Sequence, residues 1–399
     1  MARTIEDIAR GARGASRVVA ALDAATKNAV LHDLALVIED REPEILAANA
    51  EDIGAAEKAG LDGPKLKRLK LTVDALAQMR AGLVQIANLP DPVGEVTRGY
   101  EVPSGLRVER VRAPLGVIAM IYEARPGVTV DAFALCFKAG NACILKGGRE
   151  ATHSNEVLST LVRAVLAEHG VPADAMCAFT SSDRDEMKRM LGLVGDIDLV
   201  IPRGGAGLIR FVHEHAKVPT VQHFEGVCHV YVDERADLDK ALEIVATGKT
   251  SAPATCNSTE CVLIHAKVAD AFLPRLRARA DADGVELREG DYGTEFLDLI
   301  LSYKVVPSMD DAVAHIHEHT SNHTESIVTE DSPAAERFCR AVQSSCVLVN
   351  ASTRFNDGFQ LGLGAEIGIS TSRIHAYGPM GLEELTCQRW VVRGDGQTR

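Results

Sequence analysis

The N-terminal part of the chain has the hydrophobic pattern of a group of helices. Over roughly the first 90 residues, apolar side chains recur at helical spacing among good helix formers, for example at Val30, Leu34 and Ile38. Two prolines and a glycine in residues 88–94 end this pattern. Residues 101–112 then roughly alternate between apolar and charged side chains, which predicts one or two exposed antiparallel strands.

From residue 115 onward, short continuous apolar runs replace the alternation. These runs are residues 115–122, 142–145, 198–201 and 228–232, and the helical stretches between them are residues 129–139, 151–169 and 183–194. Such runs are typical of strands buried on both faces. Strands that alternate with helices predict a mostly parallel sheet in an α/β fold. A second block of the same kind follows over residues 236–350.

The composition is that of a folded, acidic protein. Of the 399 residues 46% are hydrophobic, and 43 basic against 56 acidic residues give a net charge of −13. The length predicts two or three domains of about 100–200 residues each. The acidic balance argues against non-specific nucleic-acid binding, which needs a basic face. No apolar run approaches the roughly 18–20 residues that span a bilayer, and no secretory pattern opens the chain, so we expect a cytoplasmic protein without membrane contact.

Cysteines and histidines offer chemistry, but their spacing predicts no metal site. Neither a Cys-x-x-Cys pair nor a disulfide framework is present among the nine cysteines. His315, His317 and His319 alternate, and side chains two apart on a helix do not face each other. Cys256 differs, because it lies in a polar loop of small residues that leads into a strand, where a thiolate and nearby backbone N–H groups can act together. By residue type alone, a structural cysteine is the favoured alternative.

Nucleotide-binding signals are weak. The chain has neither a Gly-x-Gly-x-x-Gly fingerprint nor a phosphate loop of the Walker type. Gly204 and Gly205 follow a predicted strand and precede a helix, and Lys146 ends another strand. Ligands of open α/β sheets bind at the carboxyl ends of strands, which favours a binding role for these three residues. Ordinary turn glycines and a solvated lysine remain the alternative.

A resemblance to a known family supports several of these candidate roles together. Matching segments occur in one order along nearly the whole chain, at residues 108–116, 122–126, 128–132, 144–148, 201–205, 226–233, 255–257, 297–301, 323–331 and 378–385. In these segments the chain resembles the gamma-glutamyl phosphate reductases of the aldehyde dehydrogenase superfamily. Each segment is weak alone, but so many in one order are specific.

The resemblance implies an aldehyde dehydrogenase-like α/β fold. Its parts are a Rossmann-type cofactor domain, an α/β catalytic domain with the nucleophilic cysteine, and a small β oligomerisation arm. Their expected bounds are residues 1–97 and 115–226 for the cofactor domain, 227–360 for the catalytic domain, 361–385 for the return segment to the cofactor domain, and 98–114 with 386–396 for the arm. Because such arms pair by strand addition, we expect a homodimer or homotetramer.

The resemblance also implies a reaction, the second step of proline biosynthesis from glutamate. NADPH would reduce L-glutamyl 5-phosphate to L-glutamate 5-semialdehyde and phosphate, which would make the chain an NADP-dependent glutamate-5-semialdehyde dehydrogenase (phosphorylating). Cys256 would attack the acyl phosphate, and the thioester would accept a hydride. Asn257 and the Cys256 backbone N–H would hold the oxyanion. The glutamate 5-kinase that makes the substrate would be a separate chain, with which we expect a functional association.

Binding residues follow by analogy with the superfamily. Lys146 and Glu295 would hold the adenosine ribose of the cofactor, and Gly204 and Gly205 would line its groove. The carboxylate and phosphate of the substrate require arginines, preferably as bidentate forks. The expected substrate residues are Arg125, Ser370, Thr371, Arg373 and His375.

The chain departs from the related patterns at four places. Aldehyde-oxidising relatives carry an asparagine where this chain has Ala124, and a glutamate base where it has His223, with Glu225 nearby. A reductase delivers hydride and needs no base to activate water. The reductases themselves are expected to carry asparagine at Gly127 and arginine at Tyr377, which bears on the substrate pocket.

Two other functions stay open on the sequence alone. A CoA-acylating aldehyde dehydrogenase would use acyl-CoA in place of an acyl phosphate. A non-catalytic scaffold would keep the fold and would need none of Cys256, Lys146 and Glu295, so their joint presence argues against it.

Overall fold

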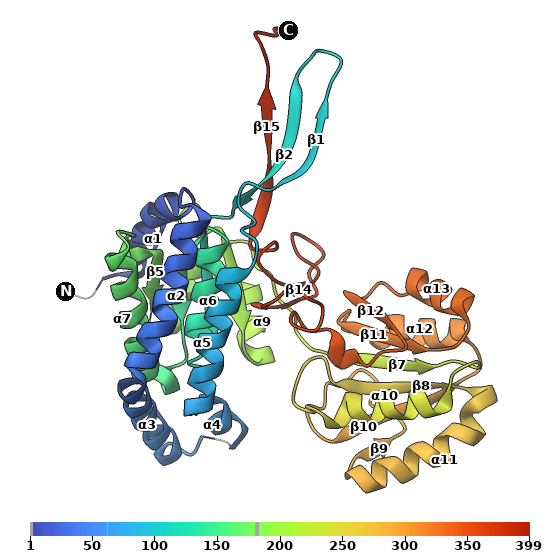
Figure 1. The fold of residues 1–399 in the computed structure, drawn as a ribbon. Helices are drawn as coiled ribbons and strands as arrows, with labels where there is room; N and C mark the ends of the chain where they lie inside the picture. The colour runs from blue at the N-terminus through green and yellow to red at the C-terminus, as the bar shows by residue number, and fades with distance from the viewer. Residues whose placement is uncertain (1–2, 62, 180–182) are drawn as a thin grey trace. The chain divides into compact units, whose positions relative to one another are not determined.

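The computed structural model describes residues 3–61, 63–179 and 183–399, and the chain divides into two units (Figure 1). We call them the N-terminal unit, which comprises residues 1–222, 363–368 and 380–399, and the central unit, which comprises residues 223–362 and 369–379. Each unit is built around its own parallel sheet. The α/β class predicted from the apolar runs is therefore confirmed.

The helical pattern at the start of the chain is confirmed as well. It forms α1 (Ile5–Val19), α2 (Ala24–Asp40), α3 (Glu42–Lys58), α4 (Gly63–Leu69) and α5 (Val73–Asn88). Short polar side chains start three of these helices: Thr4 and Asp7 form a capping box on α1, and Asp23 and Thr72 accept backbone N–H groups of α2 and α5.

A parallel sheet forms the core of the N-terminal unit. In sheet order its strands are β5 (Met176–Ala178), β4 (Ala142–Lys146), β3 (Val117–Tyr122) and β6 (Leu199–Arg203). The connecting helices are α6 (Val128–Lys138), η1 (Arg149–Ala151), α7 (Thr152–Glu168), η2 (Ala173–Ala175), α8 (Arg184–Leu191) and α9 (Ala206–His215). The strand order reverses between β3 and β6, and ligands of such sheets bind at the carboxyl ends of the strands that flank a reversal.

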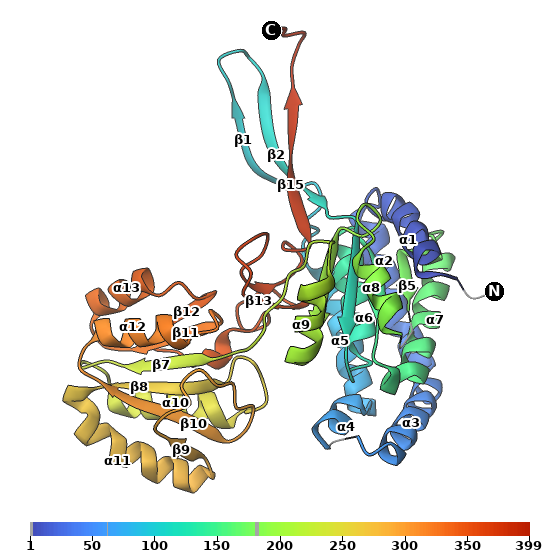
Figure 2. The same cartoon turned by 180° about the vertical axis from the view of Figure 1, so that it is seen from behind.

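Helices cover both faces of this sheet (Figure 2). Helices α1, α8 and α9 share a core with one face, in which Ile8, Met190 and Val212 pack against strand residues such as Ala119 and Ile144. Helices α6 and α7 pack on the opposite face, with α2 and α5 outside them. The continuous apolar character of β3, which is buried at every position, follows from this double cover.

The central unit holds the second sheet. In sheet order its strands are β12 (Cys346–Val349), β11 (Thr324–Val328), β7 (Cys228–Val232), β8 (Thr259–His265), β10 (Ile300–Val306) and β9 (Glu286–Arg288). Its helices are α10 (Leu238–Thr250), α11 (Ala266–Asp283), α12 (Met309–His319), α13 (Ser332–Ala341) and η3 (Thr353–Phe355). Strands β11, β7 and β8 are adjacent, parallel and buried throughout. The segments that enter these three strands therefore meet at one edge of the sheet.

An antiparallel arm extends from the helices of the N-terminal unit (Figures 1 and 2). It consists of β1 (Val96–Glu101), β2 (Arg107–Pro114) and β15 (Thr386–Arg393) in the order β1–β2–β15. The predicted antiparallel pairing is confirmed. The predicted exposure holds for β1, where every residue is exposed, but was wrong for β2, where Glu109 and Val111 are buried. The predicted span of 101–112 was wrong in its bounds, because residues 102–106 form the turn between β1 and β2.

Two shorter elements complete the described chain. Strands β13 (Gly368–Ser370) and β14 (Gly378–Met380) form a small sheet of their own. Among the residues that the structure describes, every helix is too short or too polar to cross a bilayer.

Candidate active site

Cys256 lies in the loop that joins α10 to β8, where the sequence pattern placed it. The loop is held by its own hydrogen bonds, since Thr255 Oγ1 donates to the Ala252 carbonyl oxygen at 2.8 Å and the Ser258 N–H donates to the Thr255 carbonyl oxygen at 3.0 Å. The carbonyl oxygen of Cys256 accepts the thiol of the buried Cys228 at 3.2 Å. Cys256 itself is only half-buried. Its main chain is therefore held in place by the loop, while its side chain is accessible from outside.

Two histidines lie beside this thiol at the edge where β11, β7 and β8 begin. The ligating atoms of His223, Cys256 and His323 all lie within 4.8 Å of one another. The two rings meet edge to face, with centroids 5.5 Å apart. His223 Nδ1 lies 2.9 Å from the carbonyl oxygen of Ile369. A carbonyl oxygen only accepts, so Nδ1 carries the ring proton and the lone pair of His223 is on Nε2.

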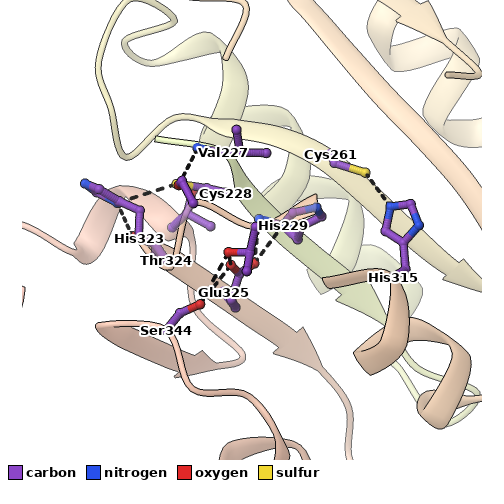
Figure 3. Close-up of polar contacts among 12 residues, drawn as sticks. Val227, Cys228, His229, Cys261, His315, His323, Thr324, Glu325 and Ser344 are labelled. Atoms are coloured by element: carbon purple, nitrogen blue, oxygen red, sulfur yellow. Dashed lines mark hydrogen bonds and ion pairs between the residues drawn. The ribbon is translucent and has the colours of Figure 1, made fainter. Parts of the chain in front are cut away.

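His323 is fully buried next to Cys228 (Figure 3). Its Nδ1 lies 2.7 Å from the Thr324 hydroxyl, and its Nε2 has no hydrogen-bond partner within the described part of the chain. Burial, together with a smaller effect of the neighbouring His223, lowers the pKa of His323 to about 3. The ring is therefore neutral near pH 7, and one of its polar atoms remains available beside the thiol.

Asn257, expected to hold the oxyanion, supports the loop in this structure. Its side chain is buried, and Nδ2 donates to the carbonyl oxygens of Asn356 at 3.0 Å and Arg354 at 3.4 Å. Its own carbonyl oxygen accepts the Thr353 hydroxyl at 2.8 Å. The Asn257 amide thus joins the cysteine loop to η3 and the residue after it.

Glu295 is linked to the cysteine loop by Gly226, which contacts both. Its Oε1 accepts the Gly226 N–H at 2.9 Å. A Cβ at Gly226 would stand 1.9 Å from the Cys256 carbonyl oxygen, so only glycine allows this approach. Burial raises the pKa of Glu295, and Glu225 raises it further. Glu295 therefore belongs to the surroundings of Cys256 in the central unit.

A buried ion pair ties the two ends of the cysteine loop together. Lys249 Nζ, in the last turn of α10, lies 2.7 Å from Glu260 Oε2, the second residue of β8. The two side chains are 1% and 0% exposed. Burial raises the pKa of Glu260 to about 7, although Lys249 opposes this shift.

The N-terminal unit contains a cavity at the predicted end of its sheet. Its volume is about 680 Å³. Its wall includes the end of β3, Lys146 at the end of β4, and the first turns of α9. Three arginines, Arg149, Arg184 and Arg210, also line it, together with Glu123, Glu150 and Glu214. With Lys146, the wall thus has four basic and three acidic side chains, so their charges nearly balance.

Of the predicted cofactor residues of this unit, Lys146 lines that cavity, whereas Gly204 and Gly205 lie next to Glu123, which lines it. Lys146 Nζ donates to the Gly147 carbonyl oxygen at 3.3 Å, and burial lowers its pKa against the opposing effect of Glu150 and Glu123. Gly205 is the N-cap of α9, and its N–H donates to Glu123 Oε2 at 3.2 Å. Open space faces the Cα of Gly205, as a groove residue requires.

The predicted substrate residues occur in both units. Arg125 is exposed in the N-terminal unit, whereas Ser370, Thr371, Arg373 and His375 belong to the central unit. Ser370 is buried, directly after the Ile369 carbonyl that holds His223. The Arg373 guanidinium donates to the side chain and carbonyl oxygen of Gln343 and stacks on Tyr377, at 5.5 Å from the ring centre.

Comparisons with known proteins agree with this architecture. A sequence model of the aldehyde dehydrogenase family matches residues 1–291. The gamma-glutamyl phosphate reductase of Xanthomonas axonopodis pv. citri is 50% identical over 412 aligned positions, which cover 99% of this chain and 100% of that protein. The chain belongs to the gamma-glutamyl phosphate reductase family. A crystal structure of the gamma-glutamyl phosphate reductase from Thermotoga maritima matches all of both chains with a TM-score of 0.97 at 39% identity.

Outside the reductase family, the likeness is one of fold. An acetylating aldehyde dehydrogenase from Geobacillus thermoglucosidasius matches 99% of this chain with a TM-score of 0.71, at 15% identity. That identity does not favour a CoA substrate over an acyl phosphate. The aldehyde dehydrogenase-like fold predicted for this reductase-family chain is confirmed, and the family uses a nicotinamide cofactor.

Sequence reasoning missed the part of His323 in this site. The alternating histidines drew attention to His315, His317 and His319 as a group, but chain spacing does not reveal which histidine lies beside Cys256. The hydrophobic pattern gave little signal, because His323 immediately precedes β11, a strand that begins with three polar residues and pairs with β7.

Proposed function

We propose that this chain reduces L-glutamyl 5-phosphate to L-glutamate 5-semialdehyde and phosphate with NADPH, through a thioester on Cys256. Membership of the reductase family supports the substrate. The observation that carries the mechanism is the grouping of Cys256 with His223 and His323 at one edge of the central sheet.

His223 is the group that takes the thiol proton. Its Nδ1–H donates to the Ile369 carbonyl oxygen, so the basic lone pair that can accept the thiol proton is on Nε2. A free cysteine is only a few per cent thiolate at neutral pH and needs such a partner. As the Cys256 sulfur forms its bond to the acyl carbon, the bond to the phosphate oxygen breaks. His223 then returns the proton to the departing phosphate.

The main-chain N–H of Cys256 is the better candidate for stabilising the oxyanion. The Asn257 amide already donates to two carbonyl oxygens and is buried, so it positions the loop. A backbone donor held by the Cys228 and Thr255 hydrogen bonds is fixed in advance of the reaction.

When bound, NADPH would supply a hydride, and the thioester on Cys256 would then give the aldehyde and the free Cys256 thiolate. The cavity of the N-terminal unit fits the adenosine half, with Lys146 at a ribose hydroxyl and Gly205 at the start of α9. Arg149, Arg184 and Arg210 suit the additional phosphate of NADPH, because guanidinium groups bind phosphate as forks. Glu295, which neighbours Cys256 through Gly226, suits the ribose on the nicotinamide side in place of the adenosine ribose.

The remaining predictions concern substrate and assembly. Arg125 and Arg373, with Ser370, Thr371 and His375, are proposed to receive the carboxylate and phosphate of the substrate. The domain roles keep the predicted bounds, with residues 98–114 and 386–396 as the assembly arm. Its edge strands β1 and β15 carry unpaired backbone groups, which supports a homodimer or homotetramer by strand pairing. Functional association with a glutamate 5-kinase is part of the same proposal.

The reaction run backwards decides the acyl acceptor. Glutamate semialdehyde and NADP⁺ are mixed with the enzyme and either phosphate or CoA, and the absorbance of the reduced cofactor is followed. The proposal predicts reduction of NADP⁺ that needs phosphate and ignores CoA. Reduction that needs CoA would select the acylating dehydrogenase, and no reduction with either would select the scaffold.

A further inference from the structure

A second cluster of metal-ligating side chains lies deeper in the central unit than the Cys256 site. His229 on β7, Cys261 on β8 and His315 on α12 are all buried, and their ligating atoms lie within 4.8 Å of one another. The sulfur of Cys261 is 4.0 Å from Nε2 of His315 (Figure 3). None of these three residues takes part in the reaction described above.

The orientation of His229 is the strongest observation. Its Nδ1 lies 2.9 Å from Glu325 Oε2, and because a carboxylate only accepts, Nδ1 carries the proton. The lone pair is therefore on Nε2, which is fully buried and has no hydrogen-bond partner within the described residues. A histidine that donates to a carboxylate with one nitrogen and presents the other to a cluster is the arrangement found at metal sites.

Glu325 gives a second, independent argument based on charge. The carboxylate is 0% exposed and accepts hydrogen bonds from the His229 N–H at 3.0 Å, from the Ser344 hydroxyl at 3.0 Å and from Thr320. Within the part of the chain that the structure describes, no lysine or arginine forms an ion pair with it. A divalent cation with the Cys261 thiolate and the Glu325 carboxylate nearby would make the cluster neutral.

We propose that His229, Cys261 and His315 bind a divalent transition-metal ion of the zinc class. Two imidazole nitrogens and one thiolate are a borderline ligand set that suits Zn²⁺, with water in the fourth position. Tetrahedral zinc separates such ligand atoms by about 3.3–3.5 Å, from bond lengths near 2.0 and 2.3 Å. The cluster has to contract by only about half an ångström between Cys261 and His315 to reach that geometry. The ion would join β7, β8 and α12.

Proton chemistry at the site is simple. Burial raises the pKa of the Cys261 thiol well above its usual range, so the thiol is protonated without metal. A bound dication deprotonates a coordinating thiol, and the proton leaves to solvent. Burial lowers the pKa of His315 to about 3, so this ring is already neutral at pH 7.

Lys304 opposes binding and supplies a discriminating variant. Its Nζ donates to Nδ1 of His315 at 3.1 Å, which puts the proton of the neutral ring on Nε2. Coordination through Nε2 requires the other tautomer, so the ammonium group has to swing away. The Lys304→Gln variant offers an amide oxygen that can accept Nδ1–H, and it removes a positive charge near the ion. We expect it to bind metal more tightly than the unchanged chain.

The experiment uses Co²⁺ alone, as a spectroscopic substitute for zinc, added to the chelator-treated full chain. One equivalent is expected to produce a thiolate-to-cobalt charge-transfer band and the intense visible bands of tetrahedral cobalt, with release of about one proton. Cys261→Ser should remove the charge-transfer band, and Cys256→Ser, at the other histidine–cysteine cluster, should retain it. Glu325→Gln should weaken binding about 10–100-fold.

Three results would overturn the proposal. The first is a charge-transfer band that is absent at stoichiometric cobalt and appears only in large excess. The second is a band that persists in Cys261→Ser, and the third is a band that disappears in Cys256→Ser. If Cys261→Ser does not fold, the comparison of Lys304→Gln with the unchanged chain decides, since equal or weaker cobalt binding by Lys304→Gln contradicts the proposed coordination.

Discussion

The buried ion pair at the base of the cysteine loop gives a sharp prediction about stability. Replacing Lys249 with methionine leaves the Glu260 carboxylate buried without its cation, at a site where the two side chains are 1% and 0% exposed and 2.7 Å apart. Breaking a buried pair by removing one partner costs about 3–5 kcal/mol. We expect Lys249→Met to lower the free energy of unfolding by that amount at pH 8, measured by urea denaturation.

The chain offers a matched control on the same helix. Lys240 also belongs to α10 and pairs with Glu330 at 2.6 Å, but these side chains are 47% and 54% exposed. Exposed pairs contribute little, so Lys240→Met should leave the urea midpoint nearly unchanged. Adding Glu260→Gln to Lys249→Met should recover much of the loss, because a neutral amide removes the unpaired charge.

The pH dependence has a definite sign. The pKa of Glu260 is about 7 in the folded chain and lies near 4.5 when exposed, and without Lys249 the folded value rises further. The carboxyl of the folded variant therefore takes up its proton at a higher pH than that of the unchanged chain, which does so near pH 7. The deficit of Lys249→Met should shrink between pH 8 and pH 5. A deficit equal to that of Lys240→Met, or one that grows toward pH 5, would refute the reasoning.

Three further predictions follow from the two sites. His223→Asn should slow alkylation of Cys256 and lower kcat by about 10²–10⁴-fold, as loss of a proton acceptor does, with KM for NADPH little changed in steady-state assays. The pKa of His323 is about 3 in the folded chain. The free energy of unfolding should therefore fall as the pH falls from about 6.5 toward 3, by up to about 1.4 kcal/mol per pH unit. His323→Asn should reduce this slope in urea titrations at pH 6.5 and 5. Arg149→Ala should raise KM for NADPH several-fold more than KM for NADH, and an equal effect on both would remove Arg149 from the 2′-phosphate site.

Strands and the cysteine loop were predictable because local pattern determines them. The run at 228–232 is apolar at most positions since β7 is buried on both faces, and the structure has a strand over the same residues. The loop at 250–260 was predictable because small polar residues separate a helical pattern from a strand pattern. In the arm, alternation continued across the turn at 102–106, so the pattern alone hid the turn.

Groupings of side chains across the sheet were not predictable from spacing. His323 and Cys256 are far apart in the chain, and only the order β11–β7–β8 makes them neighbours. Glu295 as a ligand of the adenosine ribose stays a prediction made by analogy, and its hydrogen bond to Gly226, beside the cysteine loop, was not predictable from the sequence. The His229 cluster likewise depends on two strands and one helix that no single motif contains.

The most direct test of the account is the reverse reaction in cysteine variants. Glutamate semialdehyde, phosphate and NADP⁺ are mixed with the unchanged chain, with Cys256→Ser, and with Cys339→Ser, a half-buried cysteine of α13 outside both clusters. The account predicts phosphate-dependent NADP⁺ reduction in the unchanged chain and in Cys339→Ser, and its loss in Cys256→Ser. Phosphate-dependent reduction that persists in Cys256→Ser would contradict a thioester on Cys256.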